Sequence, residues 1–167
     1  MKLALFALIL VAGTASATDG FLLDNIKYQP AGKNADGNDQ FRFTAQCGVA
    51  EVSFVGLTHD PDIGYLAPGS GVLAVKSGKK VIKARWDTEA FRLNDNNEFA
   101  CVKTPKGPRL VISGSCAGTS GCGPDDFTVI DPATLKVLAA TKDERYCTKP
   151  CAEKALGAKV PKELLQL

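Results

Sequence analysis

Residues 109–142 read RLVISGSCAGTSGCGPDDFTVIDPATLKVLAATK, and this stretch decides the predicted fold. Three short runs in it, at residues 110–112, 127–130 and 137–140, have the length and apolar character of strands. A segment rich in Ser, Gly and Cys separates the first two runs, and Asp131-Pro132 makes a turn before the third. The stretch therefore predicts neighbouring strands joined by one long loop and one tight turn.

Further short runs of this kind recur along the chain. Residues 40–46 alternate well, with Phe41, Phe43 and Ala45 on one face. The spacing of roughly 8–12 residues favours an antiparallel sandwich, barrel or propeller-like sheet, while residues 58–71 are expected to be irregular because they are rich in Gly and Pro. The other expected strands lie at residues 21–29, 49–57, 72–75, 81–86, 89–93 and 98–103.

Helix signals are confined to the C-terminal end. Thr148 stands at a cap position, and Pro150 suits a first turn, where its missing N–H costs little. The helix would run through Leu156 and end at Gly157. Residues 161–165 are expected to add one more turn. The predicted fold class is thus mainly β with one short C-terminal helix.

The N-terminal end reads as a signal peptide over residues 1–17, followed by a single β-rich domain over residues 18–167. Lys2 precedes an apolar core of about ten residues, too short to span a bilayer, which needs about 20. Ala15-Ser16-Ala17 is a small-x-small cleavage site. These features predict a periplasmic or secreted protein without membrane insertion.

The charge balance argues against nucleic acid as a partner. The chain has 20 basic and 18 acidic residues, and removal of Lys2 with the signal leaves 19 basic residues against 18 acidic ones. Nucleic-acid binding would call for a strong basic excess. The sequence therefore predicts no nucleic-acid partner.

The six cysteines of an exported chain predict three disulfide bonds out of fifteen possible pairings. Zinc is the alternative, but a zinc site would also want histidines, and the chain has one. The Asn/Asp-rich residues 34–39 do not fit a calcium loop, which needs Gly sixth and Glu twelfth, where Asp39 and Ala45 stand. We expect no metal and no cofactor. The preferred pairs are Cys47–Cys101, Cys116–Cys122 and Cys147–Cys151.

Catalytic signatures are weak. His59, the single histidine, could act with Asp60 or Asp62, but no G-x-S-x-G motif is present, and the nearest segment ends in Cys122. The prediction is a protein that binds rather than catalyses. A hydrolase using His59 and a structural envelope protein remain the alternatives.

The loop at residues 113–124 is the strongest candidate for a site. Small residues closed by a disulfide make a stiff projection, which loses little entropy when it enters a partner's cleft. A bridged hairpin loop without a ligand is the alternative. The predicted partner-binding residues are Ser113, Gly114, Ser115, Gly118, Thr119 and Ser120.

Ser113-Gly114-Ser115, followed downstream by D-x-A-T-x-K-V at residues 131–137, resembles small periplasmic immunity proteins. Those proteins protect a bacterium from type VI secretion effectors that cut peptidoglycan. The resemblance implies that Ser115 enters the enzyme's cleft and contacts its catalytic histidine, with Ser113 in support. Here Cys116 follows Ser115 directly, and the loop is longer. The chain also resembles uncharacterised exported bacterial proteins with a Gly-Cys-rich loop before an I-D-x-x-T-x-K-V element.

Overall fold

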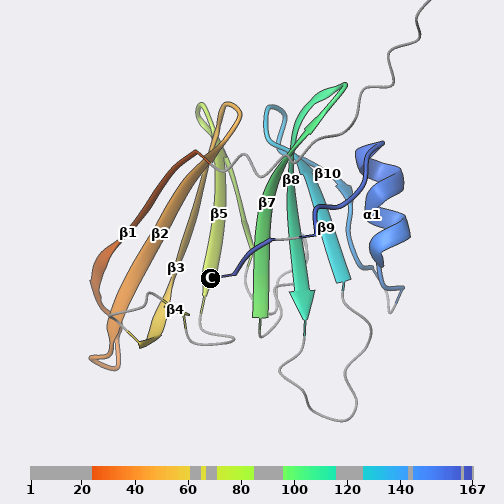
Figure 1. Cartoon of the computed structure of the whole chain (residues 1–167). Helices are drawn as coiled ribbons and strands as arrows, with labels where there is room; N and C mark the ends of the chain where they lie inside the picture. The colour runs from red at the N-terminus through yellow and green to blue at the C-terminus, as the bar shows by residue number, and fades with distance from the viewer. Residues whose placement is uncertain are drawn as a thin grey trace, which may run out of the picture.

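A computed structural model describes residues 24–60, 65–66, 71–84, 96–115, 126–142, 145–162 and 164–166 of this chain. These residues form two antiparallel sheets and one α-helix (Figure 1). The prediction of a mainly β fold with one short C-terminal helix is confirmed. The predicted signal peptide, residues 1–17, lies outside the described residues.

The first sheet has the strand order β1-β2-β3-β5-β6, with β4 paired to β3. Pairing extends beyond the expected strands, since β1 continues past Pro30 through a register shift at Gly32, which has a φ of 91°. Gly tolerates this left-handed conformation, so the strand bulges there without breaking. The strands are β1 (Asp24–Lys33), β2 (Asp39–Cys47), β3 (Ala50–Asp60), β4 (Tyr65–Leu66), β5 (Val72–Ser77) and β6 (Lys80–Ala84).

The second sheet has the order β10-β9-β8-β7-β11. The turn between β9 and β10 forms because Asp131 Oδ1 accepts hydrogen bonds from the Ala133 and Thr134 N–H groups, at 2.9 and 3.2 Å. Leu135 closes this turn at a φ of 60°. The strands are β7 (Asn96–Thr104), β8 (Gly107–Ser115), β9 (Asp126–Asp131), β10 (Lys136–Ala139) and β11 (Leu165–Gln166).

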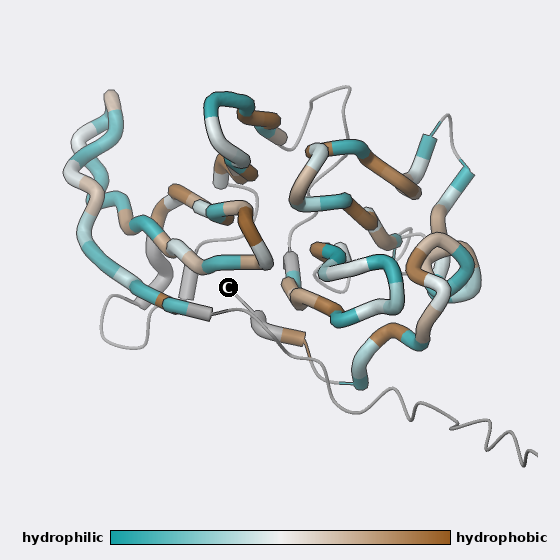
Figure 2. Tube along the Cα trace, turned by 90° about the horizontal axis from the view of Figure 1, so that it is seen from above, coloured by the Kyte–Doolittle hydropathy of each residue, from teal (hydrophilic) through white to brown (hydrophobic). Residues whose placement is uncertain are grey.

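The main core lies between the two sheets. Alternate residues of each strand point inward, as in β2, where Phe43, Ala45 and Cys47 are buried. Phe54 of the first sheet meets Phe99 of the second, with ring centroids 6.2 Å apart. Seen along the strands, the sheets lie side by side (Figure 2). The described strands therefore form two separate layers, as in a sandwich.

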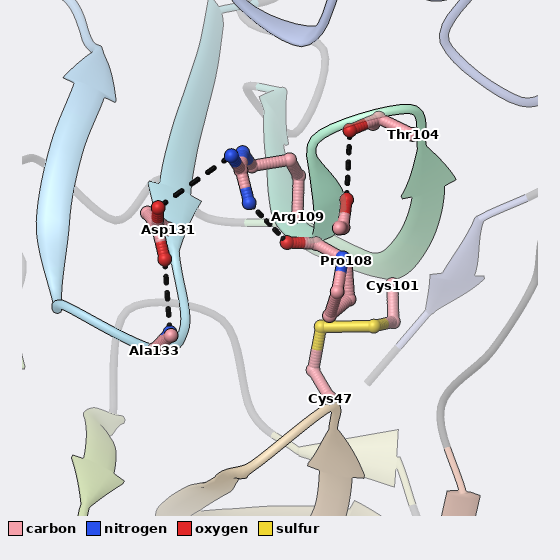
Figure 3. The surroundings of a disulfide bond; sticks show 8 residues. Cys47, Cys101, Thr104, Pro108, Arg109, Asp131 and Ala133 are labelled. Atoms are coloured by element: carbon pink, nitrogen blue, oxygen red, sulfur yellow. Dashed lines mark hydrogen bonds and ion pairs between the residues drawn. A yellow bond between two sulfur atoms is a disulfide. The ribbon is translucent and has the colours of Figure 1, made fainter.

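A disulfide between Cys47 and Cys101 joins the sheets, with a Cα–Cα distance of 5.4 Å across a sequence separation of 54 (Figure 3). It lies where the β2–β3 and β7–β8 hairpins approach each other. A Cβ on Gly48 would lie 2.5 Å from Cγ of Pro108, so the close approach requires a residue without a side chain. This predicted pair is confirmed.

The helix adds a third layer on the outer face of the second sheet (Figure 1). Helix α1 (Lys149–Leu156) ends at Gly157, whose left-handed backbone (φ 64°) lets its N–H donate to the Glu153 carbonyl. The predicted start and end are therefore confirmed, although the Thr148 side chain makes no capping hydrogen bond. The second core consists of Ala100, Val102, Val111, Phe127, Val129, Ala152, Leu156 and Val160.

The expectation of a further helical turn at residues 161–165 is wrong. None of the described residues in this range is helical, and Leu165 and Gln166 pair with Phe99 and Glu98 of β7 as strand β11. The edge of β7 carries unpaired backbone N–H and C=O groups, and pairing with them outweighs a weak local helix signal.

Candidate functional site

The first three predicted site residues lie in a strand instead of a loop. β8 continues through Ser115, which pairs with Asn96 of β7, while Gly114 pairs with both Asn97 and Asp126. Ser113 is 6% exposed and Gly114 is also buried. The expected loop therefore begins later, because backbone pairing on both sides of β8 continues to Gly114. The side chain of Ser115 lies outside the described part.

The other predicted site residues, Gly118, Thr119 and Ser120, lie outside the described residues, as does the predicted Cys116–Cys122 bridge. The described strands nevertheless fix both ends of this segment. Gly114 and Asp126 are direct cross-strand neighbours, so the chain leaves the sheet and returns to it at adjacent positions. Phe127 N–H donates to the Cys147 carbonyl at 2.8 Å, which ties the return point to the chain entering α1.

Ser113 forms part of the floor of a cleft with a volume of about 380 Å³. Its cross-strand neighbours are Glu98 on β7 and Phe127 on β9, and these three side chains form one row on the outer face of the second sheet. Helix α1 packs on the neighbouring rows of the sheet and leaves this row uncovered, so the row lies beside the N-terminus of the helix. The cleft thus opens where the helix begins.

Two short segments form the walls of the cleft. The start of the helix supplies Thr148, Lys149 and Pro150. The chain that follows the helix supplies the opposite wall through Val160, Pro161, Lys162 and Leu164. The described lining therefore combines two ammonium groups and one carboxylate with an apolar surface.

The helix wall is held by a second disulfide. Cys147–Cys151 has a Cα–Cα distance of 5.2 Å and closes the chain across the first turn of α1, which confirms this predicted pair. Cys147 N–H also donates to Thr141 Oγ1 at 2.9 Å. These bonds position Thr148 and Lys149 beside the sheet.

The opposite wall is held by a charged contact. Lys159 Nζ lies 2.8 Å from Glu153 Oε2 on the helix. This hydrogen bond from Lys159 lowers the pKa of Glu153 below its ordinary value of 4.5, and a hydrogen bond from the Val160 backbone adds to the effect. Val160, which is 5% exposed, is the apolar anchor of the same segment.

Arg109 on β8 and Asp131 on β9 form a largely buried polar cluster in the second sheet. The Arg109 guanidinium lies 3.5 Å from Asp131 Oδ2 and donates to the Pro108 carbonyl at 2.7 Å (Figure 3). It also donates to the Lys106 carbonyl at 3.1 Å. Asp131 is itself occupied by the β9–β10 turn. The cluster therefore joins two hairpins of one sheet, and its groups are satisfied by structural contacts.

The alternative catalytic residue, His59, lies in β3, and its side chain lies outside the described part. Within the described ranges, no three His, Cys, Asp or Glu side chains cluster in a way that could hold a metal ion. The same ranges contain no helix that is long and apolar enough to cross a membrane.

The sequence analysis named Ser113 as a residue of a partner-binding loop and did not predict this cleft. Glu98, Phe127 and Lys149 come from three separate elements, and no motif connects them in the sequence. The sequence signal nearest to the cleft was the helix start, where Cys147, Pro150 and Cys151 lie close together and the first turn contains no acidic residue to complement the dipole.

Comparisons with protein-family models, with curated proteins and with solved structures found no match. The class of the protein is therefore defined by its own architecture. It is a disulfide-linked, two-sheet β protein with a helix on one outer face and a small cleft at the start of that helix.

Proposed function

We propose that this chain is an exported, non-enzymatic binding protein. It recognises a protein partner with the Ser/Gly-rich segment between β8 and β9. The observation that carries the proposal is the cross-strand pair Gly114 and Asp126, which anchors both ends of that segment on neighbouring strands. Anchored ends reduce the conformational entropy that a projecting segment loses on binding.

The disulfides support the export part of the proposal. Cys47–Cys101 and Cys147–Cys151 are typical of proteins that fold in an oxidising compartment. Together with the N-terminal signal pattern, they favour the periplasm or secretion.

The partner class comes from the sequence resemblance to periplasmic immunity proteins. The partner we propose is an enzyme that cuts peptidoglycan, and the chain acts as an inhibitor by occluding its active site. Ser115 at the end of β8 would enter the cleft of that enzyme, followed by Gly118, Thr119 and Ser120.

The experiment is an inhibition assay with purified mature protein and a peptidoglycan amidase of the type VI effector class. Ser115→Arg should weaken binding by more than about tenfold, or about 1.4 kcal/mol, because a bulky charge replaces a small residue at the contact. Val49→Arg provides the matched control, since Val49 is 71% exposed in the hairpin that joins β2 to β3.

Equal thermal stability of the two variants shows that the fold is intact. Undiminished inhibition by Ser115→Arg, or failure of the unmodified chain to inhibit any amidase of the class, would overturn the proposal.

A further inference from the structure

The two described disulfides differ in how far solvent reaches them. Cys47 and Cys101, which join the sheets, are 0% and 1% exposed. Cys147 is 2% exposed, but its partner Cys151 is only half-buried and follows the exposed Pro150 in the first turn of α1. Thiol–disulfide exchange requires a thiolate to reach a sulfur atom. Of these four residues, Cys151 is therefore the one that offers an accessible point of attack in the folded chain.

Cys147 is held to its surroundings by bonds that do not involve its sulfur. Its N–H donates to Thr141 Oγ1 at 2.9 Å, and its carbonyl accepts from the Phe127 N–H at 2.8 Å. Both bonds persist when the disulfide is cleaved, so Cys147 stays on the sheet. A thiolate that attacks Cys151 expels the Cys147 sulfur, because exchange proceeds through a mixed disulfide with the attacked residue.

The disulfide is the main attachment that the described residues give to the first turn of α1. The helix has eight residues, and a helix of this length is marginal in water without tertiary contacts. Its buried residues are Ala152 and Leu156, whereas Lys149 and Pro150 are exposed and Thr148 makes no capping hydrogen bond. Cleavage of the disulfide should therefore release the first turn and leave Leu156 packed on the second sheet.

We propose that Cys147–Cys151 is a site of thiol–disulfide exchange in the folded protein, attacked at Cys151 by the dithiol of a partner oxidoreductase. The bond acts as a redox-controlled clasp on α1, while Cys47–Cys101 is a permanent structural bond. This site goes beyond the proposed function and does not depend on it, because the exchange is read on the cysteines themselves.

The exchange balances in two steps. A thiolate of the partner bonds to Cys151 Sγ, the Cys147–Cys151 bond breaks, and the electron pair leaves with the Cys147 sulfur, which takes a proton from solvent. The second thiolate of the partner then attacks the partner's own sulfur in the mixed disulfide and expels Cys151 as a thiolate, which is also protonated. The two cysteines have gained two electrons and two protons, and the partner dithiol has become a disulfide.

The first test compares the rates at which the two disulfides are reduced in the unmodified mature protein. The probe is dithiothreitol without denaturant, and alkylation followed by peptide mass spectrometry reads each cysteine separately. Cys147 and Cys151 should become alkylated more than about tenfold faster than Cys47 and Cys101, since a buried pair reacts only when the protein opens. Similar rates for the two pairs would overturn the proposal.

The second test identifies the attacked sulfur. The probe is a thioredoxin variant whose second active-site cysteine is serine, so that the mixed disulfide cannot be resolved and accumulates. The adduct should form on Cys151 and leave Cys147 as a free thiol. An adduct on Cys147, or no adduct on the folded chain, would contradict the assignment.

The third test follows the effect on α1 by amide hydrogen exchange. The Ala152 N–H, which donates to the Thr148 carbonyl at 3.1 Å, should exchange more than about tenfold faster after reduction, because its turn is released. The Gly157 N–H, which donates to the Glu153 carbonyl at the other end of the helix, is the internal control and should change far less.

The double variant Cys147→Ser/Cys151→Ser separates reduction of this bond from other effects of dithiothreitol. It should show the fast Ala152 exchange without the reagent and no further change with it. A further change in the variant, or loss of protection throughout β7 and β8 when the unmodified chain is reduced at Cys147–Cys151 alone, would show that this bond is not a local clasp.

Discussion

The two sheets share a strand arrangement, but they differ in the side chains on their outer faces and in what covers those faces. β2-β3-β5-β6 and β7-β8-β9-β10 are both antiparallel, and each buries its inner face against the other. On the first sheet, one outward row runs through Lys27, Thr44, Ser53, Ala74 and Lys83, and no described helix covers it.

On the second sheet, the corresponding outward positions are apolar. Ala100, Val111 and Val129 form one row, all fully buried, and helix α1 packs over it. The difference shows that the outward residues decide whether a sheet face needs a covering layer, since polar side chains are satisfied by water. The candidate cleft lies where this cover ends.

The largest expected effect concerns the bond that joins the sheets. Removing Cys47–Cys101 by a double substitution to Ala should lower the free energy of unfolding by about 4 kcal/mol, because the bond closes a separation of 54 residues. Removing Cys147–Cys151, with a separation of 4, should cost about 2 kcal/mol. Urea unfolding of both variants measures the two losses. Equal losses would contradict the loop-length argument.

A smaller loss of stability should distinguish the outer face of the second sheet from that of the first. Val129→Lys places an ammonium group under α1 and should lower the free energy of unfolding by about 3 kcal/mol, since burial of an unpaired charge is costly. Ser53→Lys, at the centre of the outer face of the first sheet, should change it by less than about 0.5 kcal/mol.

Chemical denaturation measures these changes, and proteolysis near α1 shows whether the helix has detached. A comparable loss in Ser53→Lys would mean that the outer face of the first sheet is also covered.

The smallest effect concerns the attachment of the chain that follows the helix. Because Lys159 lowers the pKa of Glu153, the ionised carboxylate stabilises the folded state above the ordinary pKa of 4.5. This contribution is lost as the pH falls below that value and through the lowered folded-state pKa. Lys159→Ala should raise the pKa of Glu153, as measured by a carboxyl NMR titration. Lys154→Ala is the control, and an equal rise there would contradict the assignment.

Several features could be predicted from the sequence because their causes are local. Helix α1 begins after Thr148 and ends at Gly157, since Pro150 fixes φ in the first turn and Gly157 tolerates the left-handed conformation that ends the helix. The turn at Asp131 follows from hydrogen bonds within four residues. The close spacing of Cys147 and Cys151 likewise favoured their pairing, whereas Cys47–Cys101, with a separation of 54, was only the preferred pair among the possible ones.

Other features depend on partners that are distant in the chain. Residues 165–166 join β7 because its edge needs a partner, which no local propensity shows. The strand β8 extends through Ser115 because its backbone pairs with β7, and as far as Gly114 also with β9, so Ser113 belongs to a strand and not to a loop.

The sequence alone determined that the chain is β-rich and where its helix lies, and it favoured, among fifteen possible pairings, the two disulfides of the described part. Only the tertiary structure decided that Glu98, Ser113, Phe127 and the start of α1 share one cleft. Strand register and the placement of the helix on the outer face bring them together. Both are set by packing over the whole molecule, since burial of the apolar row at Val111 and Val129 is what places the helix beside Ser113.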